Sequence, residues 1–267
     1  MLEFRTSILW RYICHAPLAL ATERAAESRL YRRYPIIPRV LDLGCGDGLF
    51  AEMLFEGQID TGVDPDPQEI KYARRRDKYR ELIRTTGDHI PKPDNYYTTI
   101  LSNSVLEHIP DLPPVLREVR RVLHDDGRFY FTAPSENFDR YSLVHSILEM
   151  LGLQGAAVAY RRFFNSFWKH YHYHSLAEWI DLTAGCGFEV QEAFTFNPRT
   201  NCTLNDVLTP FGLPGLILKR YCGRWVMSPQ VRSIVMKPIA RALTHRITAS
   251  GPCPNGGLVF MALKKSG

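Results

Sequence analysis

The chain has 267 residues, of which 45% are hydrophobic and 23% charged, and its formal net charge is +5. This apolar fraction supports a folded core and excludes a disordered chain, and no run of about 20 apolar residues predicts a membrane-spanning helix. The six cysteines include no Cys-x-x-Cys pair, which excludes the usual zinc and thioredoxin-like motifs.

The first predicted helix covers residues 18–34. It has a stripe of residues at helical spacing, formed by Leu20, Glu23, Arg24, Glu27 and Leu30. We expect residues 1–37 to form a helical leader, which either caps a ligand or only packs on a sheet. Arg5 and Arg11 interrupt the apolar pattern near the N-terminus, so we do not expect a secretory signal peptide.

The most informative stretch runs from Val40 to Gly48 and reads VLDLGCGDG. A short apolar run ends in Asp42 and is followed by glycines at alternate positions. This pattern predicts a buried parallel strand near 39–43, which stops at a ligand. Glycine allows positive φ and lets the backbone amides approach that ligand. A helix over 49–56 should then point its N-terminus toward the same ligand.

The next predicted strand, near 59–63, ends in Asp64. The dinucleotide fingerprint Gly-x-Gly-x-x-Gly fits Gly44 and Gly46, but Leu49 stands at its third glycine position. The Gly-Lys-Ser/Thr ending of the Walker loop is absent from this stretch. A glycine loop that keeps the ribose acid but lacks the pyrophosphate spacing predicts an adenosine ligand without a pyrophosphate.

The remaining predicted strands alternate with helices. Further strands are expected near 81–85, 97–102, 127–133, 188–196 and 257–264, and further helices near 67–79, 111–123 and 175–185. Such alternation predicts an α/β fold with parallel strands and helices on both faces of the sheet.

Five motifs in this order resemble the class I S-adenosylmethionine (SAM)-dependent methyltransferases, in the small-molecule, "type 11"-like form. They are residues 40–48, Asp64 with Pro65, residues 86–91, residues 100–111 and residues 123–134. The resemblance is strong over 38–134 and looser over 174–190 and the last strand. It implies SAM as cofactor and a Rossmann-like doubly wound fold, with a seven-stranded, mostly parallel sheet, one antiparallel strand near its edge, and helical insertions forming a cap.

The resemblance also implies which residues hold the cofactor. The glycine loop would hold its methionine part, Asp64 its ribose hydroxyls and Asp88 its adenine amino group. The full set is Asp42, Gly44, Cys45, Gly46, Asp64, Pro65, Asp88, His89, Asn103 and Ser104. The alternative is that the three carboxylates only stabilise loops or cap helices.

Two helical stripes follow in the insertion 135–174. The first is aliphatic, and the second is aromatic and comprises Tyr160, Phe163, Phe164, Phe167, Trp168 and Tyr171. The rings either form a core face or belong to a lid that lines a pocket for an apolar substrate. On the second interpretation, Tyr160, Phe164 and Trp168 are candidate substrate contacts.

The same insertion ends in His170-Tyr-His-Tyr-His174. In an extended segment, His170, His172 and His174 share one side, and one of them could reach the substrate. Some relatives carry a Glu-x-x-Glu-His metal motif after the fourth strand, but Ser104 replaces its first glutamate here. We therefore expect no metal.

The insertion 197–255 has an unusual charge distribution. From Val207 to the end the chain has no Asp or Glu but nine Lys and Arg. Apolar stripes also recur at helical spacing, one of them from Ile239 to Ile247. Residues 204–250 would then either contact an anionic membrane or a lipid-like acceptor, or cap the active site with a solvated basic face. No RNA-binding motif is visible, so nucleic acid is not favoured as a partner.

The pattern as a whole predicts a SAM-dependent methyltransferase that acts on a small or lipid-like acceptor at oxygen. His108, just past the fourth strand, is the candidate catalytic base, and a structural role is its alternative. The competing functions are a non-catalytic SAM-binding regulatory subunit and a nucleic-acid methyltransferase. We expect a leader at 1–37, a methyltransferase domain at 38–267, and a cytoplasmic location with peripheral membrane contact as an open alternative. The acceptor and the oligomeric state cannot be predicted from the sequence.

Overall fold

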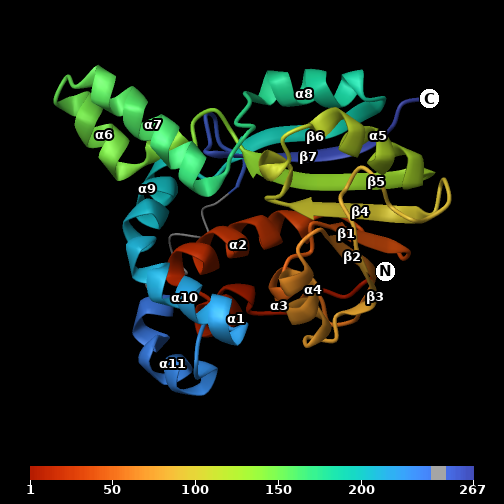
Figure 1. The fold of residues 1–267 in the computed structure, drawn as a ribbon, viewed down its shortest axis with the longest axis horizontal. Helices are drawn as coiled ribbons and strands as arrows, with labels where there is room; N and C mark the ends of the chain where they lie inside the picture. The colour runs from red at the N-terminus through yellow and green to blue at the C-terminus, as the bar shows by residue number, and fades with distance from the viewer. Residues whose placement is uncertain (242–250) are drawn as a thin grey trace.

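A seven-stranded sheet in the order β3-β2-β1-β4-β5-β7-β6 forms the centre of the protein (Figure 1). The structure is a computed structural model and describes residues 1–241 and 251–267. The strands are β1 (Val40–Leu43), β2 (Ile59–Asp64), β3 (Tyr79–Arg84), β4 (Tyr97–Asn103), β5 (Leu123–Pro134), β6 (Phe188–Phe196) and β7 (Leu258–Lys265). β7 pairs antiparallel with β5 and β6, whereas the other pairings are parallel. The predicted fold class is therefore confirmed.

Helices cover both faces of this sheet. One face carries α1 (Ile8–His15), α2 (Leu18–Tyr31), α3 (Leu49–Leu54) and α4 (Pro67–Arg74), and the other carries α5 (Leu112–Val122) and α8 (Leu176–Gly185). Each face has its own apolar core, with Tyr31 and Phe260 buried in the first and Trp179 and Phe131 in the second. The leader is thus part of the first core.

Local sequence signals explain where several helices begin. α4 begins after Asp66, whose carboxylate accepts the Gln68 N–H at 2.7 Å, and Pro67 suits the first helical turn. α8 begins with a capping box formed by Ser175 and Glu178. These signals lie within a few residues of the helix they start.

The end of α4 differs from the sequence prediction. We expected this helix to reach residue 79, but it ends at Arg74. Asp77 has a φ of 52°, and after this turn the chain begins β3 at Tyr79, opposite Ile59. Pairing of β3 with β2 therefore overrides the local helical propensity.

Both insertions are helical. They contain α6 (Leu143–Met150), α7 (Gln154–Trp168), α9 (Arg199–Leu208), α10 (Leu213–Cys222) and α11 (Pro229–Val235). In Figure 1 these helices form one flank of the molecule, beside the sheet. The expected stripe from Ile239 to Ile247 lies largely at 242–250, outside the described residues. Within residues 1–241 and 251–267, no helix combines the length and apolar character needed to cross a bilayer.

Candidate functional site

The glycine loop follows β1 and packs closely on the segment after β4. A Cβ atom on Gly44 would lie 2.3 Å from the side chain of Val105, and Gly44 has a φ of +76°, so only glycine fits this position. The N–H groups of Gly44 and Cys45 both donate to Val63 O at 2.9 Å. These two amides therefore hold the loop against β2 and are not available to a ligand.

Asp64 lies at the end of β2, beside that loop. Its Oδ2 accepts the Gly46 N–H at 3.0 Å, and its Oδ1 accepts the Asp66 N–H at 2.9 Å. Burial raises the pKa of this carboxyl from its ordinary value. Each carboxylate oxygen keeps a further acceptor position, which fits the two vicinal hydroxyls of a ribose.

Asp42, by contrast, is inside the sheet. Its Oδ2 accepts the Tyr79 hydroxyl at 2.6 Å, and burial raises its pKa to about 6. Asp42 therefore links β1 to Tyr79 of β3 through a buried hydrogen bond. Asp88 and His89 are both exposed after β3, where an adenine ring could reach them.

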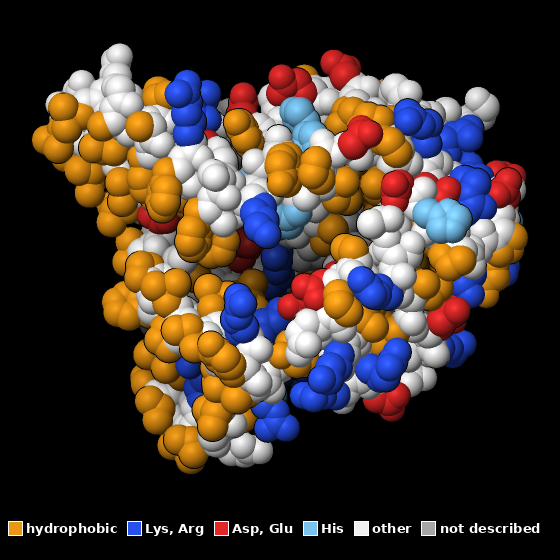
Figure 2. Space-filling view, in the orientation of Figure 1, with side chains coloured by type: hydrophobic (Ala, Val, Ile, Leu, Met, Phe, Trp, Pro, Cys, Tyr) orange, Lys and Arg blue, Asp and Glu red, His pale blue; other side chains and the backbone are white. Residues whose placement is uncertain are grey.

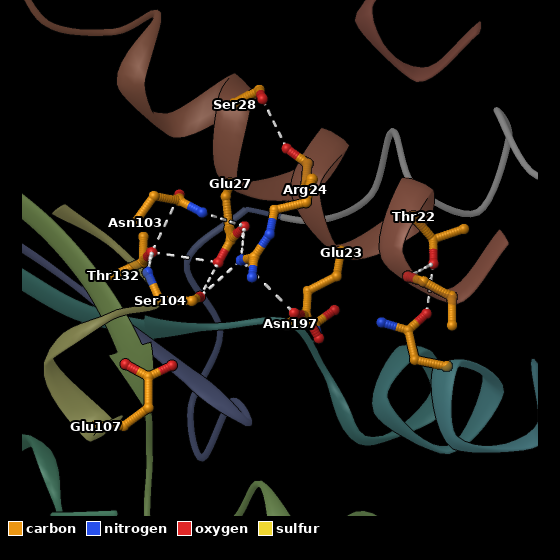
Figure 3. A network of polar contacts seen from close by, with 12 residues as sticks. Thr22, Glu23, Arg24, Glu27, Ser28, Asn103, Ser104, Glu107, Thr132 and Asn197 are labelled. Carbon is orange, nitrogen blue, oxygen red and sulfur yellow. Dashed lines mark hydrogen bonds and ion pairs between the residues drawn. The ribbon is translucent and has the colours of Figure 1, made fainter. Parts of the chain in front are cut away.

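The helix α2 brings charge to the end of β4, as Figure 3 shows. Glu27 is fully buried, and its carboxylate accepts hydrogen bonds from Arg24 Nη1 and Ser104 Oγ at 2.6 Å each. Asn103 Nδ2 and Thr132 Oγ1 donate to the same carboxylate at 3.0 and 3.2 Å. Two of the expected cofactor residues, Asn103 and Ser104, are thus bonded to the leader helix.

Arg24 lies beside the expected cofactor site and was not among the site residues that the sequence analysis named. Its Nη1 also donates to Ser104 Oγ at 2.7 Å, while its Nε and Nη2 have no hydrogen-bond partner among the described residues. Ser104 is next to Val105, which packs on Gly44. A cofactor carboxylate held at the glycine loop would therefore find free N–H groups on Arg24. The clue in the sequence was the occurrence of charged residues within the stripe of residues 20–30.

A cavity of about 280 Å³ opens beside this network. It is bounded by α2, by the ends of β4 and β5, and by residues of both insertions. Apolar contributions come from Leu20, Phe138, Phe164, Trp168, Leu216 and Trp225. In Figure 2 the face is hollowed near its middle, between the flank of insertion helices and the rest of the molecule. The cavity suits a small apolar ligand with a polar group at one end.

His108 lines the cavity beside the polar residues Ser104 and Glu107. Its Nδ1 lies 3.2 Å from Lys169 O. A carbonyl can only accept, so Nδ1 carries the proton and Nε2 keeps its lone pair. Burial lowers the pKa of His108 from its ordinary value, so the ring is neutral at pH 7. The geometry gives this histidine a free basic nitrogen beside the cavity.

Glu107 and His170 are neighbours of His108. Their ligand atoms and those of His108 lie within 4.8 Å of one another, so these side chains could also hold a cation. Glu107 Oε2 and His170 Nδ1 are buried and have no hydrogen-bond partner in the described chain. Burial raises the pKa of Glu107 to about 8 and lowers that of His170 to about 4. The sequence analysis considered Glu107 only as part of the incomplete Glu-x-x-Glu-His motif and did not name it as a site residue, because its burial depends on the tertiary fold.

The other candidate substrate residues divide into two groups. Phe164, Trp168 and His170 line the cavity, whereas Tyr160, His172 and His174 are not part of its wall. His172 donates through Nε2 to Ile109 O at 2.9 Å and accepts from His174 at 3.2 Å. The three histidines therefore do not act as one set.

The second insertion closes over the glycine loop as well as the cavity. Lys219 of α10 lies 2.8 Å from Glu69 of α4, and the Trp225 indole donates to Asp47 at 3.1 Å. Asp47 belongs to the loop itself, so residues 213–225 cover the expected cofactor site.

Comparisons with known proteins agree with this geometry. Residues 41–131 match the family model for a methyltransferase domain. A ubiquinone biosynthesis O-methyltransferase from Vibrio atlanticus is 30% identical over 109 residues, which is 39% of this chain and 46% of that protein. The chain thus matches about half the length of such relatives.

Solved structures show the same fold. A SAM-dependent methyltransferase from Thermotoga maritima, described as a possible histamine N-methyltransferase, aligns with a TM-score of 0.59 and 17% identity. That alignment covers 93% of this chain and 92% of the other. A geranyl diphosphate C-methyltransferase from Streptomyces coelicolor, solved with S-adenosyl-L-homocysteine, aligns with a TM-score of 0.50 and 16% identity over 90% of this chain and 77% of the other.

Proposed function

We propose that this chain, which contains a class I SAM-dependent methyltransferase domain, methylates a hydroxyl group of a small, lipid-like acceptor. The observation that carries the proposal is the position of His108. His108 lines a largely apolar cavity that also reaches Ser104 at the end of β4, and no hydrogen bond to its Nε2 is found among the described residues, where the Glu107 carboxyl lies 3.9 Å away. A cofactor site, a candidate base and an apolar acceptor pocket are therefore adjacent.

The chain's residues have separate tasks in this proposal. SAM, when bound, supplies a methyl group already activated on a sulfonium. Asp64 holds the ribose, Arg24 the cofactor carboxylate, and the glycine loop brings the cofactor close to β4. Phe164, Trp168 and Leu216 enclose the apolar part of the acceptor and exclude water.

His108 then removes the acceptor's hydroxyl proton at Nε2. Lys169 O fixes the ring by accepting from Nδ1–H at 3.2 Å, so the lone pair of His108 is on Nε2. The lowered pKa keeps the imidazole unprotonated at pH 7 and available as a base. As pH falls through this lowered pKa, the ring gains a proton and the rate should fall.

The test is replacement of His108 by Ala. Turnover should decrease about 10²–10⁴-fold while SAM affinity stays constant, and the acidic limb of the pH–rate profile should disappear. The assay measures S-adenosylhomocysteine release with acceptors from a cell extract and methyl-labelled SAM. His124→Ala, at the start of β5 and outside the cavity lining, is the matched control.

Three outcomes would contradict this mechanism. A His108→Ala enzyme that retains most activity removes the base assignment. Inhibition by a chelator that Mn²⁺ reverses assigns Glu107, His108 and His170 to a cation instead. SAM binding without S-adenosylhomocysteine release for any acceptor favours a regulatory subunit.

A peripheral membrane contact is the second part of the proposal. Its support is the basic, acid-free sequence after Asp206, together with the apolar cavity that the same insertion helps to enclose. A lipid-like acceptor resides in a bilayer, so an enzyme that consumes it gains from binding there.

A further inference from the structure

Exposed apolar side chains gather on one flank of the molecule. Among the described residues, every large apolar side chain with high exposure lies in the insertions 135–174 and 197–255, apart from Met1 and Ile37. The most exposed include Met150 (78%), Phe163 (64%), Phe211 (79%), Ile217 (61%) and Ile234 (71%). Figure 2 shows these hydrophobic side chains gathered over α6, α7, α9, α10 and α11. A soluble monomer rarely exposes an apolar surface of this extent without a partner.

The same flank carries unpaired positive charge. Arg220, Arg224, Lys237 and Arg241 are exposed, and no side-chain partner is found for them among the described residues. Lys219 is different because it pairs with Glu69 at 2.8 Å. Between residues 207 and 241 the sequence has no Asp or Glu to offset these charges.

The helices of this flank also enclose the cavity. Phe163 and Phe167 of α7 point outward, while Phe164 and Trp168 of the same helix line the cavity wall. Leu216 of α10 lines the cavity too, next to the exposed Ile217. The apolar surface and the cavity are thus separated by the thickness of one helix.

We propose that the exposed apolar surface of α6, α7, α10 and α11 is a docking face for an anionic lipid bilayer. The apolar side chains enter the bilayer interface, and the four free bases lie at the level of the lipid phosphates. This inference rests on the proposed function, because it gives a lipid-like acceptor a short route from the bilayer into the cavity.

Charge favours a bilayer over a second copy of this chain as the occupant. Two copies joined through this face would bring Arg220, Arg224, Lys237 and Arg241 close to the same residues of the partner. Like charges repel, whereas anionic headgroups neutralise them and release counterions. The apolar and electrostatic contributions then act together.

The test uses the full chain and vesicles of phosphatidylglycerol with phosphatidylcholine, in co-sedimentation without SAM or acceptor. Arg220→Ala/Arg224→Ala should weaken binding about 30-fold, since each base near an anionic surface contributes about 1 kcal/mol. Arg80→Ala/Arg117→Ala, on exposed residues outside the insertions, makes the same change in net charge and should bind as the wild type does. High salt should also weaken binding, because the screening length falls from about 10 Å at 0.1 M to about 3 Å at 1 M.

A second pair of variants tests the apolar part. Phe163→Asp/Ile217→Asp places one charge on each insertion and should abolish vesicle binding. Ile37→Asp, 45% exposed but outside the insertions, should have no effect. Lipids brominated in their acyl chains should quench the fluorescence of a Phe163→Trp variant more strongly than that of the wild type, because Phe163 is 64% exposed whereas Trp168 lines the cavity and Trp179 is fully buried.

Independent measurements separate this inference from the proposed function. SAM calorimetry and thermal unfolding of each variant show whether the fold and the cofactor site remain intact. Absence of binding to any vesicle, or equal binding by the Phe163→Asp/Ile217→Asp variant, overturns the docking face. Dimerisation of the wild type that the same variant abolishes assigns the face to a second copy instead. Neither result bears on methyl transfer.

Discussion

Glu27 provides the sharpest test of how the leader helix is attached to the sheet. Its carboxylate has no exposure to solvent and accepts four side-chain hydrogen bonds, one of them from the Arg24 guanidinium at 2.6 Å. Glu27→Leu removes the acceptor and leaves the Arg24 charge without its closest anion. Glu23 replaces it poorly, because Glu23 is 3.7 Å away and burial raises its pKa to about 7.

The expected loss follows from that geometry. Breaking a buried ion pair by removing one partner costs about 3–5 kcal/mol. Arg24 retains 19% exposure and its bond to Ser104, so we expect a value near the lower limit, about 3 kcal/mol. Such a loss should lower the melting temperature by about 6–12 °C in a domain of this size. Glu27→Gln should lose nearly as much, because its amide cannot accept from all four donors.

The assay is urea unfolding followed by far-ultraviolet circular dichroism, in a double-mutant cycle with Arg24→Met. Arg24→Met/Glu27→Leu removes both members of the closest ion pair and should recover most of the stability that Glu27→Leu loses. Glu189→Ala is the control, since it breaks an exposed ion pair to Lys264 and should cost less than about 1 kcal/mol. The reasoning would be refuted if the stability losses of the two single variants added up to the loss of the double variant, or if Glu27→Leu were as stable as the control.

Two further predictions concern the cofactor and the effect of pH. Asp64→Ala should lower SAM affinity by about 2–4 kcal/mol in calorimetry, because it removes charge-assisted bonds to both ribose hydroxyls; an affinity within about threefold of wild type removes the ribose assignment. Glu107 should make the protein less stable as pH rises. Burial raises the pKa of Glu107 to about 8 in the folded protein, whereas it is about 4.3 in the unfolded chain. The folded state therefore binds this proton more tightly. Its contribution to the free energy of unfolding is full below about pH 4.3 and is lost as pH rises through about 8. The slope is at most about 1.4 kcal/mol per pH unit. Urea unfolding of Glu107→Gln should lack this slope between about pH 6 and 8, and an unchanged slope would assign it to other groups.

The strands of the sheet, and the edge of the sheet where the cofactor is expected, could be predicted because the sequence patterns that mark them are local. A glycine loop after a short apolar strand, and an acid at the end of the next strand, each occupy a few consecutive residues. Parallel strands bring their carboxyl ends to one edge, so Gly44 and Asp64 are neighbours in any sheet of this order. The number of strands and the antiparallel strand near the edge came from the resemblance to a family, and the strand order came only from the structure.

The charged network could not be predicted in the same way. Glu27 and Ser104 are 77 residues apart, and Lys219 and Glu69 are 150 apart. Helical periodicity placed Glu23, Arg24 and Glu27 on one stripe but could not show that this stripe faces the end of β4. Only packing of α2 on the sheet decides that.

The aromatic stripe shows the same limit for a single helix. Its spacing predicted a helix, and α7 is one, but the prediction of a shared face for all six rings was too broad. Phe164 and Trp168 face the cavity, Phe163 and Phe167 face outward, and Tyr171 follows the helix end at Trp168. At 3.6 residues per turn these positions span about 140° of the helix circumference, so the two margins of the stripe can face different environments. In this protein one environment is the cavity, and the second environment is the surface proposed for docking.

Three titratable side chains of the cavity wall, Glu107, His108 and His170, are uncharged at neutral pH. At pH 7 the raised pKa of Glu107 leaves it protonated, and the lowered pKa values of His108 and His170 leave both rings neutral. Methyl transfer to a hydroxyl releases one proton. Among Glu107, His108 and His170, His108 is the proposed acceptor of that proton at Nε2, because the Lys169 carbonyl fixes its tautomer with the hydrogen on Nδ1. A charged carboxylate at Glu107 would instead attract a cation and hold the His108 proton after transfer. On the proposed mechanism, a neutral Glu107 lets His108 return that proton to solvent, so the same burial that costs stability at high pH would keep the proposed base free for the next turnover.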